Sequence, residues 1–178
     1  FNSTDKYNKQ TFRNRSEIYG ANGKLILTIP IIHSKEKKHQ LTKEVKIFDK
    51  INWQTNHWKS ICSAYRSSPY FEFYEQDFFN FYFKIKDNSL FNFNIKLISN
   101  ILNLLDQPFN FETISYNKEK HTKLEKLIDA KNIHFQTTKY HQVFSNKYGY
   151  LNNLSIIDLL FNLGPNTIDY LKSINIKL

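Results

Sequence analysis

The chain has 178 residues, of which 40% are hydrophobic, 16% are aromatic and only 23% are charged. This composition excludes an intrinsically disordered chain, which would carry few aromatic residues and a high net charge. The length fits one domain with a sizeable core. The net charge of +9 favours anionic partners such as phosphates, nucleotide-sugars, nucleic acid or acidic lipid headgroups. A lysine-rich, solvated surface explains the same charge equally well.

Cysteine content and hydropathy limit the setting of the protein. The single cysteine, Cys62, excludes an intramolecular disulfide and favours a reducing compartment, so we predict a cytoplasmic location. No apolar run approaches the roughly 20 residues that span a bilayer, and we predict no transmembrane segment. The chain starts at Phe1 and contains no methionine. We therefore expect one domain over residues 1–178 that lacks its natural N-terminal segment.

The first part of the chain predicts short strands followed by a helix. Residues 20–23 (Gly-Ala-Asn-Gly) form a turn, because glycine and asparagine tolerate positive φ angles. The branched apolar run at 25–32 predicts a buried strand. Val45 and Ile47 alternate with polar residues, which indicates a second, half-buried strand. Apolar residues at helical spacing predict an amphipathic helix over 53–65.

The remaining elements are predicted mainly as helices. The segment 70–83 is aromatic almost throughout, and 90–105 carries a continuous apolar stripe, so both predict helices. A further helix over 155–163 has Ser155 as its N-cap and Asp158 as the acid of a capping box. Shorter elements are a strand at 109–114, a helix at 124–130, a strand at 133–137 and an extended segment at 140–144. Alternating short strands and helices predict an α/β domain, a layered mixed sheet with flanking helices, and α+β is the alternative.

An early basic string contains five candidate substrate-binding residues, which are Lys9, Gln10, Arg13, Asn14 and Arg15. On a strand, Arg13 and Arg15 would share one face and Asn14 would point the opposite way. Two guanidinium groups could then bind one phosphate or carboxylate through paired hydrogen bonds. The alternative is a structural role, either as surface arginines or as a buried arginine paired with an acid such as Asp158.

His57 is the first candidate for acid–base chemistry. It follows Trp53 by four residues and precedes Ile61 by four, so it faces the apolar stripe of its predicted helix. A histidine in that position could exchange a proton near neutral pH. The more common role for such a residue is that of a core histidine bonded to the backbone.

A second group of candidates lies near the C-terminus. His141 is the other acid–base candidate, and Gln142, Asn153 and Asp158 are candidate substrate-binding residues. The N-terminus of the helix that follows Asn153 is a natural place for an anion. Capping explains Ser155 fully and explains Asp158 as well.

Several familiar site types are missing from the sequence. Four glycines in no phosphate-loop spacing cannot build a Walker or dinucleotide motif. Histidine and cysteine residues lack zinc-ligand spacing, so we assign no metal ligands and leave any cofactor open. Nucleic-acid modules leave signatures that are absent here, which makes nucleic acid a disfavoured partner. The oligomeric state also stays open.

Three segments resemble the WbqC-like family of bacterial proteins. They are the basic string 9–15, the stretch from Trp53 through His57-Trp58, and the block 141–165, in which polar residues are embedded in an apolar run. That family is associated with O-antigen and other surface-polysaccharide gene clusters. The resemblance therefore implies a part in O-antigen or exopolysaccharide biosynthesis, and a glycine (aminoacyl) transferase activity is one hypothesis for it.

The resemblance and the candidate residues together predict a mechanism. Arg13 and Arg15 would bind a nucleotide- or lipid-diphosphate-linked sugar, His57 or His141 would take a proton from the attacking group, and Gln142 and Asn153 would orient the sugar. The alternative is a non-catalytic accessory protein that binds a saccharide or a partner. Both depend on the two ends of the chain meeting in one cleft.

Overall fold

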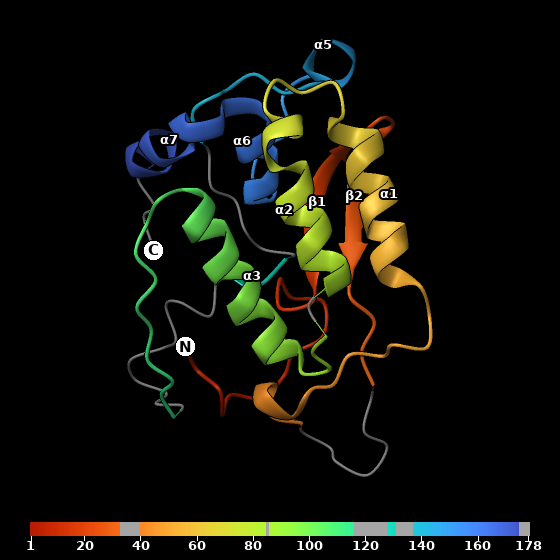
Figure 1. Cartoon of the computed structure of the whole chain (residues 1–178), viewed down its shortest axis with the longest axis vertical. Helices are drawn as coiled ribbons and strands as arrows, with labels where there is room; N and C mark the ends of the chain where they lie inside the picture. The colour runs from red at the N-terminus through yellow and green to blue at the C-terminus, as the bar shows by residue number, and fades with distance from the viewer. Residues whose placement is uncertain (33–39, 85, 116–127, 131–136, 175–178) are drawn as a thin grey trace.

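The computed structural model describes residues 1–32, 40–84, 86–115, 128–130 and 137–174. Its elements in chain order are β1 (Arg15–Gly20), β2 (Gly23–Thr28), η1 (Thr42–Glu44), α1 (Trp53–Tyr65), α2 (Phe71–Lys84), α3 (Leu90–Leu104), α5 (Ser145–Tyr148), α6 (Ile156–Leu163), η3 (Gly164–Asn166) and α7 (Thr167–Ser173). Helix α1 packs against strand β1 and against α2, and α2 in turn contacts α3 and α6 (Figure 1). The mixed α/β class is thus confirmed.

The strands β1 and β2 form an antiparallel hairpin in which Arg15 pairs with Thr28 and Gly20 with Gly23. The predicted turn at 20–23 is the connection, and Gly23 has a φ of 100°. The strand predicted over 25–32 starts earlier, at Gly23, and ends at Thr28. The prediction that it is buried is wrong, because Leu27 is its one buried residue. Beyond Thr28, the Ile29 amide donates to the Asn14 carbonyl at 2.9 Å.

The sheet of the described residues contains these two strands alone. Val45 and Ile47, predicted as a second strand, are buried, but the chain there forms only isolated bridges such as Ile31 with Ile47. The predicted strand at 109–114 likewise reduces to one bridge between Asn2 and Ile114. Helices therefore make most of the body, where the sequence predicted a wider layered sheet.

The long segments with apolar residues at helical spacing form the expected helices. The predictions over 53–65, 70–83 and 90–105 are confirmed as α1, α2 and α3, with ends that differ by at most one residue. The Ser89 side chain accepts a hydrogen bond from the Asn92 amide and so caps α3. The predicted helix at 124–130 and strand at 133–137 lie almost entirely outside the described residues. No described helix has both the length and the apolar character needed to cross a bilayer.

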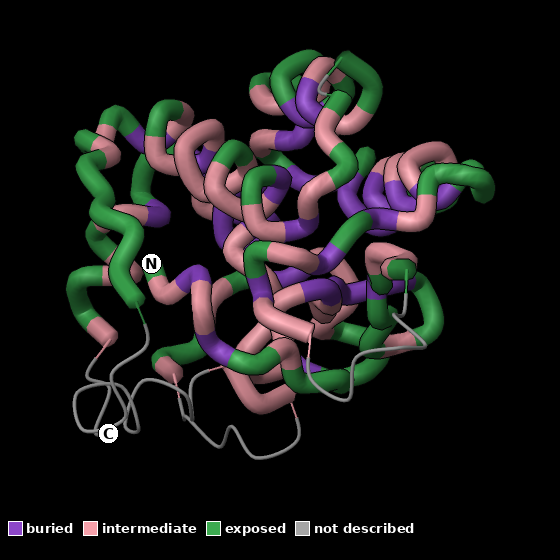
Figure 2. Tube along the Cα trace, turned by 90° about the horizontal axis from the view of Figure 1, so that it is seen from below, coloured by how far each residue is buried: buried purple, intermediate pink, exposed green. Residues whose placement is uncertain are grey.

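The core joins the hairpin to α1, α2, α3 and α6. Buried residues lie in the interior of the molecule and exposed residues lie along its outer turns (Figure 2). Phe161 of α6 is at its centre, fully buried, with its ring 5.0 Å from Tyr65, 5.2 Å from Phe71 and 5.3 Å from Phe78. Cys62 packs against this cluster, and burial raises the pKa of its thiol. A second apolar cluster gathers around the ring of Trp53, between α1, α2 and α3.

Candidate functional site

A cavity of about 430 Å³ lies among the hairpin, α1, α2, α3 and the start of α6. Five of the predicted site residues line it, namely Arg13, Asn14, Arg15, His57 and Asn153. The remaining wall is mainly apolar and comes largely from the helices. The Ser155 amide donates to the Glu17 carbonyl at 2.7 Å, which holds the C-terminal segment against β1. The two ends of the chain therefore contribute to one hollow.

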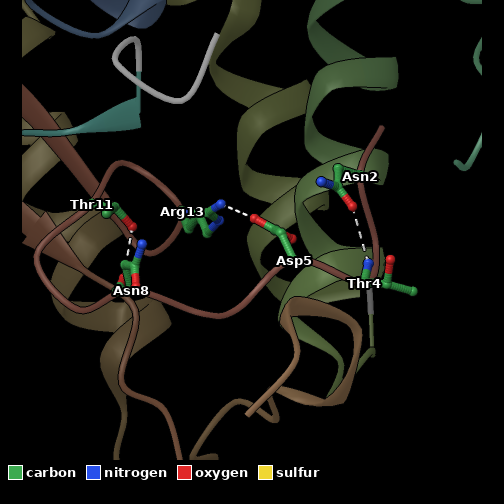
Figure 3. Close-up of polar contacts among 6 residues, drawn as sticks. All are labelled: Asn2, Thr4, Asp5, Asn8, Thr11 and Arg13. Atoms are coloured by element: carbon green, nitrogen blue, oxygen red, sulfur yellow. Dashed lines mark hydrogen bonds and ion pairs between the residues drawn. The ribbon is translucent and has the colours of Figure 1, made fainter. Parts of the chain in front are cut away.

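Three residues of the basic string, Arg13, Asn14 and Arg15, each carry a polar atom without a hydrogen-bond partner among the described residues. Arg13 forms an ion pair with Asp5 through Nη2, and these side chains point toward each other (Figure 3). Asn14 donates through Nδ2 to the Ile29 carbonyl at 3.0 Å. By contrast, Arg13 Nη1, Asn14 Oδ1 and Arg15 Nε are buried and have no hydrogen-bond partner among the described residues. The acid that neutralises Arg13 is Asp5, not Asp158.

The charge of this string is not fully balanced. Asp5 offsets Arg13, whereas Arg15 makes no ion pair within the part of the chain that the structure describes. Burial raises the pKa of the nearby Tyr7, and the charges of Arg13 and Arg15 oppose that rise. A buried donor or acceptor without a partner costs about 1 to 3 kcal/mol. Arg13 Nη1, Asn14 Oδ1 and Arg15 Nε therefore each carry such a cost in the folded chain.

His57 combines a core contact with a place in the cavity wall. Its side chain is buried, and Nε2 lies 3.1 Å from the Thr28 carbonyl oxygen, to which it must donate. Burial lowers the pKa of His57, so the ring is neutral at pH 7 and Nδ1 carries the free lone pair. The ring also packs edge-on against Trp53, with centroids 5.1 Å apart.

We expect His57 to make the fold sensitive to mild acid. Its pKa in the folded state lies below the ordinary value of 6.5, so between these two values the unfolded chain binds more protons. The free energy of unfolding should therefore fall as pH drops below 6.5. Urea denaturation at several pH values from 8 to 5 measures this, and His57→Gln should flatten the profile. An equally steep fall in the variant would contradict the role of His57.

Two C-terminal candidates are engaged in a buried network. Tyr65 donates to Asp158 Oδ1 at 2.7 Å, Tyr140 donates to Asp158 Oδ2 at 2.5 Å, and Gln142 Nε2 donates to the Leu151 carbonyl at 2.9 Å. Asp158 and Gln142 are both fully buried. Burial raises the pKa of Asp158, although these donors oppose the rise. The network ties the segment that carries Asn153 to α1.

The predicted capping box at the start of α6 does not form. Ser155 occupies the N-cap position, but its side chain makes no capping hydrogen bond among the described residues. Asp158 instead turns its carboxylate to the two tyrosines, and the Ser155 amide that a capping box would offer it donates to the Glu17 carbonyl.

Besides the buried Gln142 and Asp158, three predicted residues lie outside the cavity wall, and all three are on the surface. His141 is exposed and is not part of the cavity wall. Lys9 and Gln10 are also exposed and lie in the turn before Thr11, where Gln10 has a φ of 61°. The structure therefore brings Arg13, Asn14, Arg15, His57 and Asn153 together and leaves these three on the surface.

Two residues at the site went unnoticed in the sequence. Asn94 lines the cavity and donates from Nδ2 to the Arg13 carbonyl at 2.7 Å. The sequence contained a clue to Asn94, because a polar residue beside Phe93 within the apolar stripe of α3 is a candidate for a buried polar role. Asp5, the partner of Arg13, had no comparable signal, because nothing in its spacing links it to an arginine eight residues later.

No curated protein and no solved structure matches this chain. The model of the WbqC-like protein family matches residues 2–133. The match covers the basic string, the hairpin and helices α1 to α3, whereas the block 141–165 and Asn153 lie beyond it. Because the match spans well over half of the chain, the protein belongs to the WbqC-like protein family.

Proposed function

We propose that this protein binds an anionic, sugar-linked substrate beside Arg13 and Arg15 and acts in bacterial O-antigen or exopolysaccharide biosynthesis. Family membership supports the biological setting. The observation that carries the ligand class is the cluster of buried, unpartnered atoms from three consecutive residues in one cavity wall, as counted among the described residues.

The chemistry of these atoms matches a phosphorylated sugar. Arg13 Nη1 and Arg15 Nε are donors that would bind phosphate oxygens, and charge-assisted bonds of this kind are the stronger ones. Asn14 Oδ1 is an acceptor that would bind a hydroxyl. The Asn153 amide in the same wall would orient the sugar. A ligand with both oxyanions and hydroxyls therefore meets the needs of the site.

Glycine (aminoacyl) transfer is the second candidate function, and the neutral His57 in the same wall favours it. The sugar amine or hydroxyl would attack the carbonyl carbon of an activated glycyl ester and lose its proton to His57 Nδ1. The new bond to the glycyl carbon forms as the ester bond breaks, and the leaving alkoxide takes the proton from His57. His141 is outside the wall, so His57 is the base that we favour.

We expect Arg15→Gln to weaken binding of inorganic diphosphate by about 10- to 100-fold, because one charge-assisted hydrogen bond is worth about 1.5 to 3 kcal/mol. Isothermal titration calorimetry of the full chain measures this. The matched control is Arg66→Gln, which removes the same charge from a side chain that is 71% exposed. Equal losses in both variants would reduce the effect to net charge and contradict a specific site.

The composition of the cell-surface polysaccharide distinguishes the two candidate functions. Mass spectrometry would compare a strain lacking the gene with strains that carry the wild-type, Arg15→Gln or His57→Gln protein. Transfer requires that both substitutions remove the same sugar substituent. A loss with Arg15→Gln alone supports the non-catalytic binding protein. Unchanged polysaccharide in the strain without the gene would contradict a part in its biosynthesis.

A further inference from the structure

A second cavity, of about 530 Å³, adjoins the first one. Phe12, Arg13, Asn94, Leu97 and Ile98 line both cavities, so the two hollows meet at the basic string and the middle of α3. Arg13 therefore borders both cavities.

The second cavity is lined mainly by hydrocarbon. Its apolar side chains come from the N-terminal segment, from α3 and from the stretch after α3, and they include Phe1, Ile95 and Ile114. Phe1 and Ile114 are partly exposed, at 42% and 39%. A hydrocarbon group that displaces water from apolar surface in such a hollow lowers the free energy of the system, so its binding there is favourable.

Arg13, which borders both cavities, and its partner Asp5, which lines the second, each keep a polar atom without a hydrogen-bond partner among the described residues. Asp5 is only 6% exposed, and its Oδ1 has no hydrogen-bond partner among the described residues, just as Arg13 Nη1 has none. The two side chains use their other polar atoms on each other (Figure 3). A group with an anionic oxygen for Arg13 and a hydroxyl for Asp5 would satisfy both. A phosphate or a phosphorylated sugar has this combination.

We propose that one ligand occupies both cavities and that it is a lipid phosphate. Its phosphate or diphosphate head lies between Arg13 and Arg15, and its hydrocarbon chain lies against Ile95 and Ile114 beside α3. This inference rests on the proposed function, since it names the class of the anionic substrate. A nucleotide-linked sugar fits less well, because its ribose and base would place polar groups against that apolar wall.

The test is calorimetric titration of the full chain with farnesyl diphosphate, dodecyl phosphate, inorganic diphosphate and UDP-glucose, each kept below any micelle-forming concentration. We expect farnesyl diphosphate to bind at least about 30-fold tighter than inorganic diphosphate, because burying a few methylene groups provides that factor. Ile114→Asn should weaken farnesyl diphosphate at least about 5-fold and leave inorganic diphosphate unchanged. The control Ile26→Asn changes an isoleucine that is 50% exposed and lies outside both walls, and it should change neither.

The outcomes separate this inference from the proposed function. If inorganic diphosphate or UDP-glucose binds and depends on Arg15, but farnesyl diphosphate binds no tighter, the lipid class is wrong and the anion site stands. If none of the four probes binds, both proposals fail. If farnesyl diphosphate and dodecyl phosphate both bind more tightly than inorganic diphosphate by similar factors, the second cavity accepts any hydrocarbon chain. If only farnesyl diphosphate binds more tightly, the cavity prefers a prenyl chain.

Discussion

Asp158→Ala should destabilise the folded protein by about 3 to 5 kcal/mol, the largest effect that we expect from a single substitution. The change removes a fully buried acceptor and leaves the hydroxyls of the buried Tyr65 and the half-buried Tyr140 without their partner. It also loosens the segment that carries Asn153 into the cavity. The midpoint and slope of urea denaturation measure the loss.

Two further variants test the origin of this effect. Asp158→Asn keeps the shape and one acceptor oxygen, so we expect a smaller loss than for alanine. Asp169→Ala removes an exposed acid from the first turn of α7 and should cost less than about 1 kcal/mol. If Asp158→Ala were as mild as Asp169→Ala, the buried network would not hold the C-terminal segment in place.

Gly164→Ala should cost about 2 to 5 kcal/mol for two separate reasons. Gly164 ends α6 with a φ of 55° and a ψ of −128°, a backbone conformation that is nearly exclusive to glycine. A β-carbon at this position would also overlap the ring of Tyr70. Thermal and urea unfolding of the variant would measure the sum of strain and overlap.

Matched variants separate strain from overlap. Gly149 also has a positive φ, of 75°, but a β-carbon there would have no neighbour within 4 Å, so Gly149→Ala should show the strain alone. Adding Tyr70→Ala to Gly164→Ala should restore part of the loss, which a double-mutant cycle quantifies. Equal costs at the two glycines would show that the Tyr70 ring moves aside and that the overlap carries no energy.

Local patterns of residues were enough to predict the elements that depend on periodicity or on a tight turn. The bounds of α1 and α3 follow from apolar residues at helical spacing, and the hairpin turn follows from glycine and asparagine at 20–23. These signals are local, because a helix face or a tight turn is defined by residues within a few positions of one another. The stretches around Val45 and Ile114 had strand-like alternation, yet alternation specifies a face and not a partner strand.

The tertiary structure alone decided how the site residues are used. Spacing placed His57 on the buried face of α1, but only the fold brought its Nε2 to the Thr28 carbonyl. It likewise selected Asp5 as the partner of Arg13 and gave Asp158 to the two tyrosines. These contacts join residues between 8 and 93 positions apart in the chain, and many polar pairings are compatible with one local pattern. Burial then selects among them, because a polar group removed from water must find a partner wherever the packed chain presents one.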